Sequence, residues 1–163
     1  MKSIPEARLI VAGSGNFSGC LEAAAPCWRQ VSFTGFVSKE QLYELYAIAD
    51  LGVVPSIHEE FGYVAAEMML NKLPIIVNDT TGLKEITDNG KHAMYFHFDK
   101  ERNITSLKEV LLNALDTIYT EEQLYEVQKR ILDNYSLPFF SKHIKEFYNR
   151  LKNPNDTINN LEL

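Results

Sequence analysis

Two carboxylates and a glycine stand where one apolar run gives way to the next. Glu59 and Glu67 bracket Gly62 in the stretch HEEFGYVAAEMML, residues 58–70. The residues after Gly62 are small and apolar, which favours a helix that begins at this glycine. The stretch therefore combines a helix start with two acidic side chains.

The start of that helix is suited to binding an anion. The N–H groups of Phe61, Gly62 and Tyr63 are expected to be unpaired there, beside the positive end of the helix dipole. Such a helix start can hold a phosphate or a diphosphate. If the preceding run is a strand of a parallel sheet, this loop also lies at its carboxyl end, where doubly wound folds bind ligands.

Glu67 is the unusual residue of the helix, because its neighbours are alanine, valine and methionine. A carboxylate in such surroundings is costly unless hydroxyl or amide groups bind it. A ribose diol beside bound phosphates would supply two hydroxyl donors. On spacing alone, the alternative that Glu59 and Glu67 are ordinary surface acids stays open.

The elements that must position these residues are short apolar runs with helices between them. The runs show little alternation, which is typical of parallel strands covered on both faces. Strands that alternate with helices predict an α/β, Rossmann-like, doubly wound parallel sheet. The five predicted strands are residues 8–13, 30–35, 51–56, 73–79 and 93–99.

Helices fill the intervals and the C-terminal part. Ser38 and Gln41 have the spacing of a capping box before the helix at 39–50. Further helices are predicted at 62–71 and, ending at Gly90, from residue 81. The next helical stretch carries one apolar face that is expected to pack in the core, made up of Leu107, Val110, Leu111, Ala114, Leu115 and Ile118. Two C-terminal helices are predicted after it, near 121–134 and 139–151. We predict one domain over residues 1–152 and a polar, frayed tail over 153–163.

The glycines after the first strand do not form a dinucleotide fingerprint. Gly13 and Gly15 follow the strand, but Gly19 comes one residue too late for the spacing GxGxxG. The second strand also lacks the acidic residue that binds a ribose in that fold. A tight turn, or a loop that lets a ligand approach the backbone, is the better interpretation.

Composition excludes several classes of protein. The formal charge of −6 argues against a nucleic-acid partner, which needs a basic face. Cys20 and Cys27 have no companions at metal-ligand spacing, which favours two reduced thiols. No apolar stretch reaches the length of a membrane span, and the N-terminus lacks a signal-peptide core. These features favour a cytoplasmic protein and leave peripheral contact with the inner face of the membrane open.

The stretch from Pro55 to Phe96 resembles the core of retaining nucleotide-sugar glycosyltransferases of the large group-1 family, which have the GT-B architecture. The family pattern is Pro-Ser, a Glu, one residue, Phe-Gly, and a second Glu after seven intervening positions, the EX7E motif. Pro55-Ser56, Glu59, Phe61-Gly62 and Glu67 match it in order and spacing. Later matches are Pro74, the strand 75–77, Gly82, Glu85 and Asp88-Asn89-Gly90.

The resemblance extends upstream to about Pro5 and implies the C-terminal, donor-binding half of a GT-B fold. Lys72 stands where the family usually has Gly. The larger departure is that the family's first strand–helix unit of this domain, with an Arg and a Lys for the diphosphate, has no counterpart before Ser3. The N-terminal acceptor domain has none either.

The resemblance also assigns roles. It implies that Glu67 binds the ribose hydroxyls and that Glu59, the expected catalytic residue, faces the transferred sugar and supports its hydroxyls. The N–H groups of Phe61, Gly62 and Tyr63 would meet the diphosphate. It places Phe36 and Val37 by the base and Gly13 and Gly15 along the nucleotide cleft.

The implied function is transfer of a hexosyl-type sugar from a nucleoside diphosphate sugar to a glycan or lipid-linked acceptor, as in polysaccharide biosynthesis. No metal or other cofactor is expected, because no Asp-x-Asp motif is present. The partners would be a nucleotide sugar and the missing N-terminal acceptor domain, without which the isolated chain is expected to be inactive. Two alternatives are a non-catalytic nucleotide-sugar-binding or partner-subunit module and a flavodoxin-like domain, whose early phosphate loop is not found.

Overall fold

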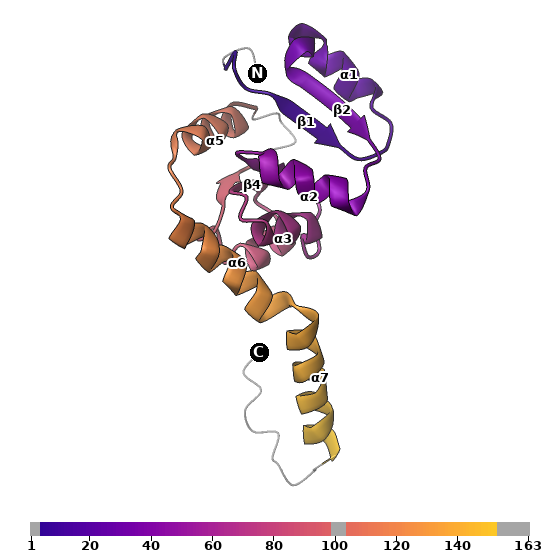
Figure 1. The fold of residues 1–163 in the computed structure, drawn as a ribbon, viewed down its shortest axis with the longest axis vertical. Coiled ribbons are helices and arrows are strands. Elements are labelled where there is room, and N and C mark those ends of the chain that lie inside the picture. The colour runs from indigo at the N-terminus through magenta and orange to yellow at the C-terminus, as the bar shows by residue number, and fades with distance from the viewer. Residues whose placement is uncertain (1–3, 99–103, 153–163) are drawn as a thin grey trace. The chain divides into compact units, whose positions relative to one another are not determined.

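The computed structural model describes residues 4–98 and 104–152 of the 163-residue chain. The chain divides into two compact units, residues 1–48 (unit 1) and 49–163 (unit 2). Figure 1 labels their helices and strands.

Unit 1 holds a two-stranded parallel sheet and three helical segments. The two strands are in register from Leu9 opposite Val31 to Val11 opposite Phe33, and the register shifts after Val11. In chain order the elements are β1 (Leu9–Ala12), α1 (Ser18–Ala24), the 3₁₀ segment η1 (Ala25–Gln30), β2 (Val31–Gly35) and α2 (Lys39–Ile48).

The strands of unit 1 are more exposed than their sequences predict. Leu9 and Ile10 of β1 are 40% and 41% exposed, so the expectation of a strand covered on both faces is wrong here. Among the described residues of unit 1, the buried apolar side chains are those of Ala24 and Tyr46. A parallel sheet of two strands with so few buried side chains gains little hydrophobic stabilisation.

Unit 1 is therefore expected to unfold at a lower denaturant concentration than unit 2. Trp28, the single tryptophan of the chain, lies in unit 1, so its fluorescence reports on that unit. In a urea titration the fluorescence transition should precede the far-UV circular dichroism transition, to which the helices of unit 2 contribute most. Coincident transitions would show that the two units unfold together.

Unit 2 is built on a three-stranded parallel sheet in the order β3–β4–β5. Helices follow each strand, and three longer helices make up the C-terminal part. The elements are β3 (Gly52–Val54), α3 (Tyr63–Leu70), β4 (Ile75–Asn78), α4 (Thr81–Ile86), β5 (Met94–Phe96), α5 (Ile104–Asp116), α6 (Glu121–Tyr135) and α7 (Leu137–Lys152).

Both faces of this sheet are covered, as the continuous apolar character of β4 predicts. Ile75 and Val77 belong to a buried cluster with residues of α3, α4 and α6. Ile76, which points to the opposite face, packs in a second cluster with Phe96 and Ala114. All four residues of β4 are buried, so this strand is the centre of the unit.

The predicted alternation of strands and helices is confirmed, and so is the α/β fold with parallel strands. The capping box before α2 is present, since Gln41 N–H donates to Ser38 Oγ (3.3 Å) and Ser38 N–H donates to Gln41 Oε1 (2.9 Å). The helix expected to end at Gly90 ends at Ile86, and a turn with positive φ at Asp88, Asn89 and Gly90 follows.

Two details differ from the sequence-based expectations, and a third expectation falls outside the described residues. α1 and η1 were not predicted, because the seven residues of α1 are too few to display a helical period. Ile118 lies beyond the end of α5 and is 89% exposed, and Leu115 is 42% exposed, so the expectation that these two residues belong to the core stripe is wrong. The tail predicted at 153–163 lies outside the described residues, and the division into one domain and a tail stays a prediction.

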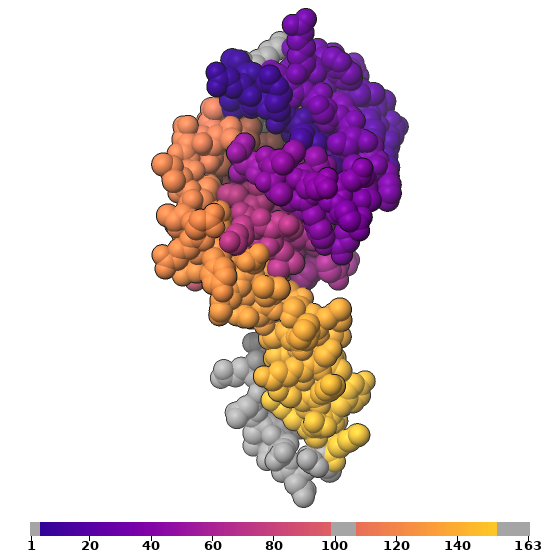
Figure 2. All heavy atoms as spheres, viewed as in Figure 1, coloured from indigo at the N-terminus to yellow at the C-terminus, as the bar shows by residue number. Residues whose placement is uncertain are grey.

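The last helix carries an exposed apolar face. No residue of α7 is buried, and no other coloured element overlies its visible side in Figure 2. Large apolar side chains recur along it at spacings of three and four, namely Phe140 (62% exposed), Ile144 (39%), Phe147 (57%), Tyr148 (58%) and Leu151 (62%). A helix of this pattern normally packs that face against another surface.

Candidate functional site

The carboxyl ends of the three strands of unit 2 are linked by one buried side chain. The side-chain amide of Asn78, at the end of β4, donates to Ser56 O in the loop after β3 (3.0 Å). Its Oδ1 accepts the N–H of Phe98 after β5 (2.9 Å). Asn78 is buried, with 4% of its surface exposed. Its two hydrogen bonds hold the loops at the edge of the sheet where ligands bind in doubly wound folds.

The loop between β3 and α3 closes on itself through Glu59. The half-buried carboxylate accepts the N–H of Gly62 on Oε1 (3.2 Å). Gly62 is the N-cap residue of α3, with φ of 94°, a conformation that favours glycine. The expectation that the N–H of Gly62 is unpaired is therefore wrong, because the chain supplies its own carboxylate there.

The aromatic residues of this loop differ in their surroundings. The ring of Phe61 lies 4.8 Å from that of Tyr63 and 5.4 Å from that of Tyr135 on α6, centroid to centroid. Phe61 thus anchors the loop against the core, whereas Tyr63 is 74% exposed. His58, beside Glu59, is exposed.

Glu67 lies one turn into α3 and is half-buried. Its neighbours Ala65 and Ala66 are buried, so a carboxylate at this position stands at the margin of the core. Within unit 2 the predicted residues Glu59, Gly62 and Glu67 belong to one strand-to-helix connection, with Phe61 and Tyr63 between them.

The remaining predicted site residues lie in unit 1. Gly13 has φ of 124°, and its N–H donates to Gly35 O (3.0 Å), so the ends of β1 and β2 are tied. Gly15 follows in the same loop. Phe36, directly after β2, is 82% exposed, and Val37 is half-buried.

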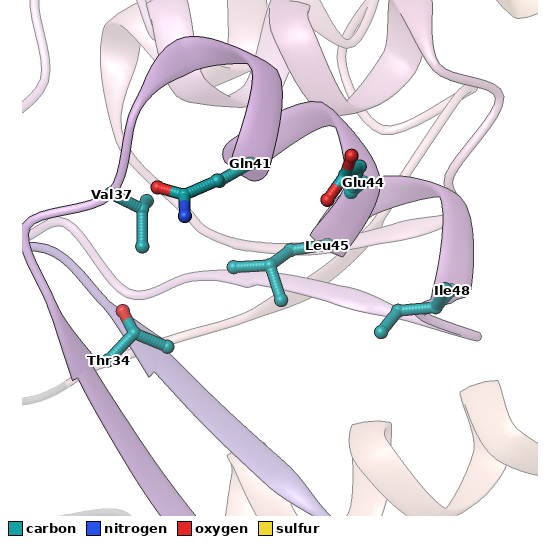
Figure 3. A pocket seen from close by; sticks show the side chains of 6 residues that line it. All are labelled: Thr34, Val37, Gln41, Glu44, Leu45 and Ile48. Atoms are coloured by element: carbon teal, nitrogen blue, oxygen red, sulfur yellow. The ribbon is translucent and has the colours of Figure 1, made fainter.

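Val37 lines an open groove of about 490 Å³ in unit 1. In Figure 3, Thr34 rises from β2 toward Leu45, which points down from α2. Much of the lining is apolar, which suits a flat ring better than a charged group. The lining residues are Thr34, Val37, Gln41, Glu44, Leu45 and Ile48.

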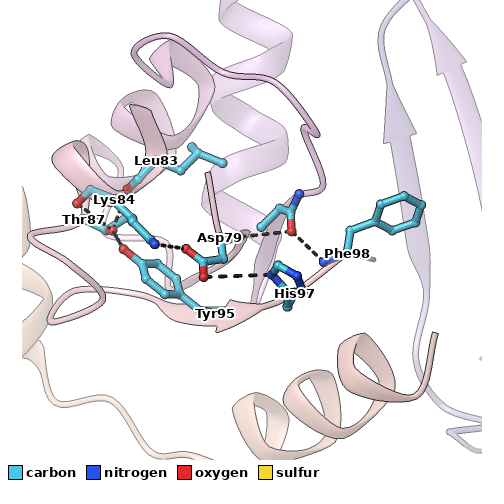
Figure 4. A network of polar contacts seen from close by, with 8 residues as sticks. Asp79, Leu83, Lys84, Thr87, Tyr95, His97 and Phe98 are labelled. Carbon is cyan, nitrogen blue, oxygen red and sulfur yellow. Dashed lines mark hydrogen bonds and ion pairs between the residues drawn. The ribbon is translucent and has the colours of Figure 1, made fainter. Parts of the chain in front are cut away.

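A polar network borders the loops of unit 2 and was not anticipated from the sequence (Figure 4). Lys84 Nζ lies 2.6 Å from Asp79 Oδ1, and His97 Nδ1 lies 4.0 Å from Asp79 Oδ2. The hydrogen bond to Asp79 and the negative charge of Asp79 raise the pKa of Lys84 above its ordinary value. The sequence signal for this network was that Asp79 and His97 directly follow the apolar strands β4 and β5.

The Asp79→Asn substitution is expected to return the pKa of Lys84 toward that of a free lysine. An amide accepts a weaker hydrogen bond from an ammonium group and brings no charge. A ¹³Cε titration of Lys84 between about pH 9 and 12 measures the change. Asp88→Asn, which removes the partner of Lys91, is the matched control and should leave Lys84 unaltered. If the pKa of Lys84 is the same in Asp79→Asn as in the wild type, Asp79 is not the cause of the raised pKa.

Across residues 4–98 and 104–152, no three His, Cys, Asp or Glu side chains are grouped as metal ligands. Both cysteines are free thiols. No helix in the described part of the chain has the length and apolar character needed to cross a membrane.

Residues 1–131 match the family described as glycosyl transferases group 1. An uncharacterised glycosyltransferase of Methanocaldococcus jannaschii is 30% identical over 147 residues, 87% of this chain and 37% of that protein. The GDP-mannose-dependent alpha-(1-6)-phosphatidylinositol dimannoside mannosyltransferase of Mycobacterium tuberculosis is 38% identical over 91 residues, 54% of this chain and 24% of that protein.

Solved structures share the fold. HepE of Anabaena, in complex with UDP, superposes with a TM-score of 0.74 at 20% identity and covers 89% of this chain. Sucrose-phosphate synthase of Thermosynechococcus elongatus gives a TM-score of 0.71 at 20% identity over 93% of this chain. These similarities span 41% and 40% of the two proteins, so the chain corresponds to about two fifths of their length.

Proposed function

Because the chain belongs to the glycosyl transferases group 1 family, we propose that it is the donor-binding part of a retaining glycosyltransferase. The donor is a nucleoside diphosphate sugar, and the acceptor is a glycan or a lipid-linked molecule. The observation that carries this proposal is the connection from β3 to α3, where Glu59, Gly62 and Glu67 stand at the carboxyl edge of a parallel sheet.

The proposed roles follow the chemistry of each group. Glu67, half-buried beside apolar neighbours, binds the ribose diol, and Glu59 binds hydroxyls of the transferred sugar. The N–H groups of Phe61 and Tyr63 meet the diphosphate at the start of α3. Gly62 N–H is engaged by Glu59, so it becomes available to a ligand only when that carboxylate moves.

Bond breaking places negative charge on the departing diphosphate while the anomeric carbon gains positive character. The start of α3 stabilises that negative charge. Glu59 is assigned to holding the sugar rather than to attack on it, because retaining hydrolysis needs a pair of carboxylates placed for acid and nucleophile. Phe36 and Val37 are proposed to contact the base, and Gly13 and Gly15 to line the nucleotide cleft.

The acceptor is proposed to bind to a part of the enzyme outside this chain, since the matched relatives are more than twice as long. The exposed apolar face of α7 is proposed to pack against that part in the intact enzyme. We also propose a cytoplasmic site of action with contact at the inner membrane face, which fits a lipid-linked acceptor.

Titration of the ¹⁵N-labelled chain with UDP, GDP, ADP and their hexose conjugates tests the proposal. At least one nucleotide should shift the amide signals of residues 59–67, and inorganic pyrophosphate should shift fewer of them. The absence of any response at millimolar concentration, or a response confined to α7, would overturn the proposed function.

The isolated chain is expected to bind donor without turning it over. Half of a site cannot orient the acceptor, and orientation supplies a large part of the rate. Release of nucleoside diphosphate from a nucleotide sugar, measured with and without a glycan acceptor, should stay at the background rate. Sustained acceptor-dependent release by the purified 163-residue chain would contradict this prediction.

A further inference from the structure

Gly82, in the first turn of α4, lies directly against the loop that carries Glu59. Its N–H donates to Glu59 O (3.1 Å), across 23 positions of the chain. The residue is buried, and a Cβ at this position would stand 2.5 Å from both Glu59 O and Glu60 O and would also meet Glu60 C. These are backbone atoms, so no side-chain rotation relieves the overlap.

The glycine is not explained by its own backbone. Gly82 is helical and is not among the glycines with positive φ, which are Gly13, Gly15, Gly35, Gly62 and Gly90. An alanine could adopt the same backbone conformation without strain. The close approach of the Glu59–Glu60 backbone is therefore what requires a residue without a side chain.

The next residue of α4 holds the other end of the same loop. Leu83 is fully buried, and its Cδ2 would lie 2.9 Å from a Cβ placed on Gly62. Gly62 N–H in turn donates to the Glu59 carboxylate (3.2 Å). The first turn of α4 thus contacts the loop at Glu59 through Gly82 and at Gly62 through Leu83.

We propose that Gly82 is a positioning residue for the Glu59 carboxylate. The hydrogen bond to Glu59 O and the close packing on the Glu59–Glu60 backbone fix the point from which the side chain extends. The carboxylate can then reach Gly62 N–H or, by small rotations, a ligand beside it. The inference rests on the proposed function only for the identity of that ligand, a sugar hydroxyl.

The test compares the amide proton shift of Gly62 in four chains: wild type, Glu59→Gln, Gly82→Ala and the double variant. Glu59→Gln should move this signal, because an amide is a weaker acceptor than a carboxylate. In the Gly82→Ala background, the shift change caused by Glu59→Gln should be smaller by about half or more than in the wild-type background. The reason is that a misplaced carboxylate forms a weaker hydrogen bond, since hydrogen bonds weaken steeply with distance and angle. An equal change in both backgrounds would overturn the proposal.

Gly90→Ala is the matched control. It replaces a glycine of the same unit, with φ of 87° and the Tyr95 ring 3.2 Å from the added Cβ, away from the Glu59 loop. It should perturb folding while leaving the effect of Glu59→Gln on Gly62 intact. Loss of that effect in Gly90→Ala as well would show that general destabilisation, rather than positioning, is responsible.

If Gly82→Ala does not fold, hydrogen exchange at the Gly82 amide of the wild-type chain tests the proposal instead. The amide of Gly82 lies in the first turn of α4, where no intrahelical acceptor exists. Its bond to Glu59 O predicts exchange about tenfold slower or more than in an unstructured peptide. Exchange at the unstructured rate would overturn the proposal.

A binding measurement links the positioning to sugar recognition. Gly82→Ala should raise the Kd of UDP-glucose or GDP-mannose, whichever the wild type binds, by about threefold or more. It should leave the Kd of UDP or GDP within about twofold, because those ligands lack the sugar. A wild-type chain that binds neither nucleotide would refute the proposed function, and the Gly62 signal would still decide the role of Gly82.

Discussion

The Glu67→Ala variant is expected to bind nucleoside diphosphate roughly 10- to 150-fold more weakly than the wild-type chain, a loss of about 1.5–3 kcal/mol. Glu67 is half-buried in the first turns of α3, beside the buried residues Ala65 and Ala66. A carboxylate in this setting forms stronger hydrogen bonds to a diol than one in bulk water does. Calorimetric titration with UDP or GDP measures the difference.

Glu60→Ala is the matched control for charge. Glu60 is an exposed acid in the same loop, so its removal changes the net charge by the same amount without removing the proposed ribose contact. Its affinity should stay within about twofold of the wild type. Equal affinities of Glu67→Ala and Glu60→Ala would count against the ribose role of Glu67.

A deoxynucleotide separates the ribose contact from a change of fold. The wild-type chain should bind 2′-deoxy-UDP more weakly than UDP, since one hydroxyl donor is lost. In Glu67→Ala the two ligands should bind alike, because the carboxylate that distinguishes them is gone. A difference that persists in the variant would assign the hydroxyl to another residue.

The order of strands and helices was predictable because each signal is local. The runs that became β3 and β4 are β-branched and bounded by turn residues, and the Ser38–Gln41 capping box marks the start of α2. The acidic pair and Gly62 also lie within nine residues of one another. A helix start after a strand brings such residues to one edge whatever the rest of the chain does.

Burial was less predictable, because it depends on neighbours that a run does not encode. The runs containing β1 and β4 look alike in sequence, yet Ile10 is 41% exposed and Ile76 is fully buried. The difference lies in how many strands and helices lie alongside. β4 has a strand on each side and helices on both faces, whereas β1 pairs with β2 alone among the described strands.

Contacts between distant segments were not predictable from spacing either. Asn78 bonds residues 22 positions before it and 20 after it. The Glu59 carboxylate accepts the N–H of Gly62, which the sequence pattern leaves without an assigned partner, because an acidic side chain can fold back onto an N–H three residues further along the chain. The identity of the acceptor for the Gly62 N–H is visible only in the folded chain.

The Leu83→Ala variant is expected to lose about 2–5 kcal/mol of the free energy of unfolding of unit 2. Leu83 is fully buried and belongs to the apolar cluster that includes Ala65, Met69 and Val77. Removal of its isobutyl group leaves a hole between α4 and the sheet that the surrounding side chains fill only in part. Urea unfolding followed by far-UV circular dichroism measures the loss.

The same substitution also tests whether α4 supports the Glu59 loop. Leu83 packs on Gly62, so its loss should broaden or shift the Gly62 amide signal even under conditions where the variant is folded. Leu132→Ala, at a position that is 50% exposed on α6, is the control and should lose about 1 kcal/mol or less. Because Trp28 lies in unit 1, its fluorescence transition should be affected by neither substitution. A Leu83→Ala chain as stable as Leu132→Ala would mean that α4 is not part of the core, and the support of the Glu59 loop would have to be sought elsewhere.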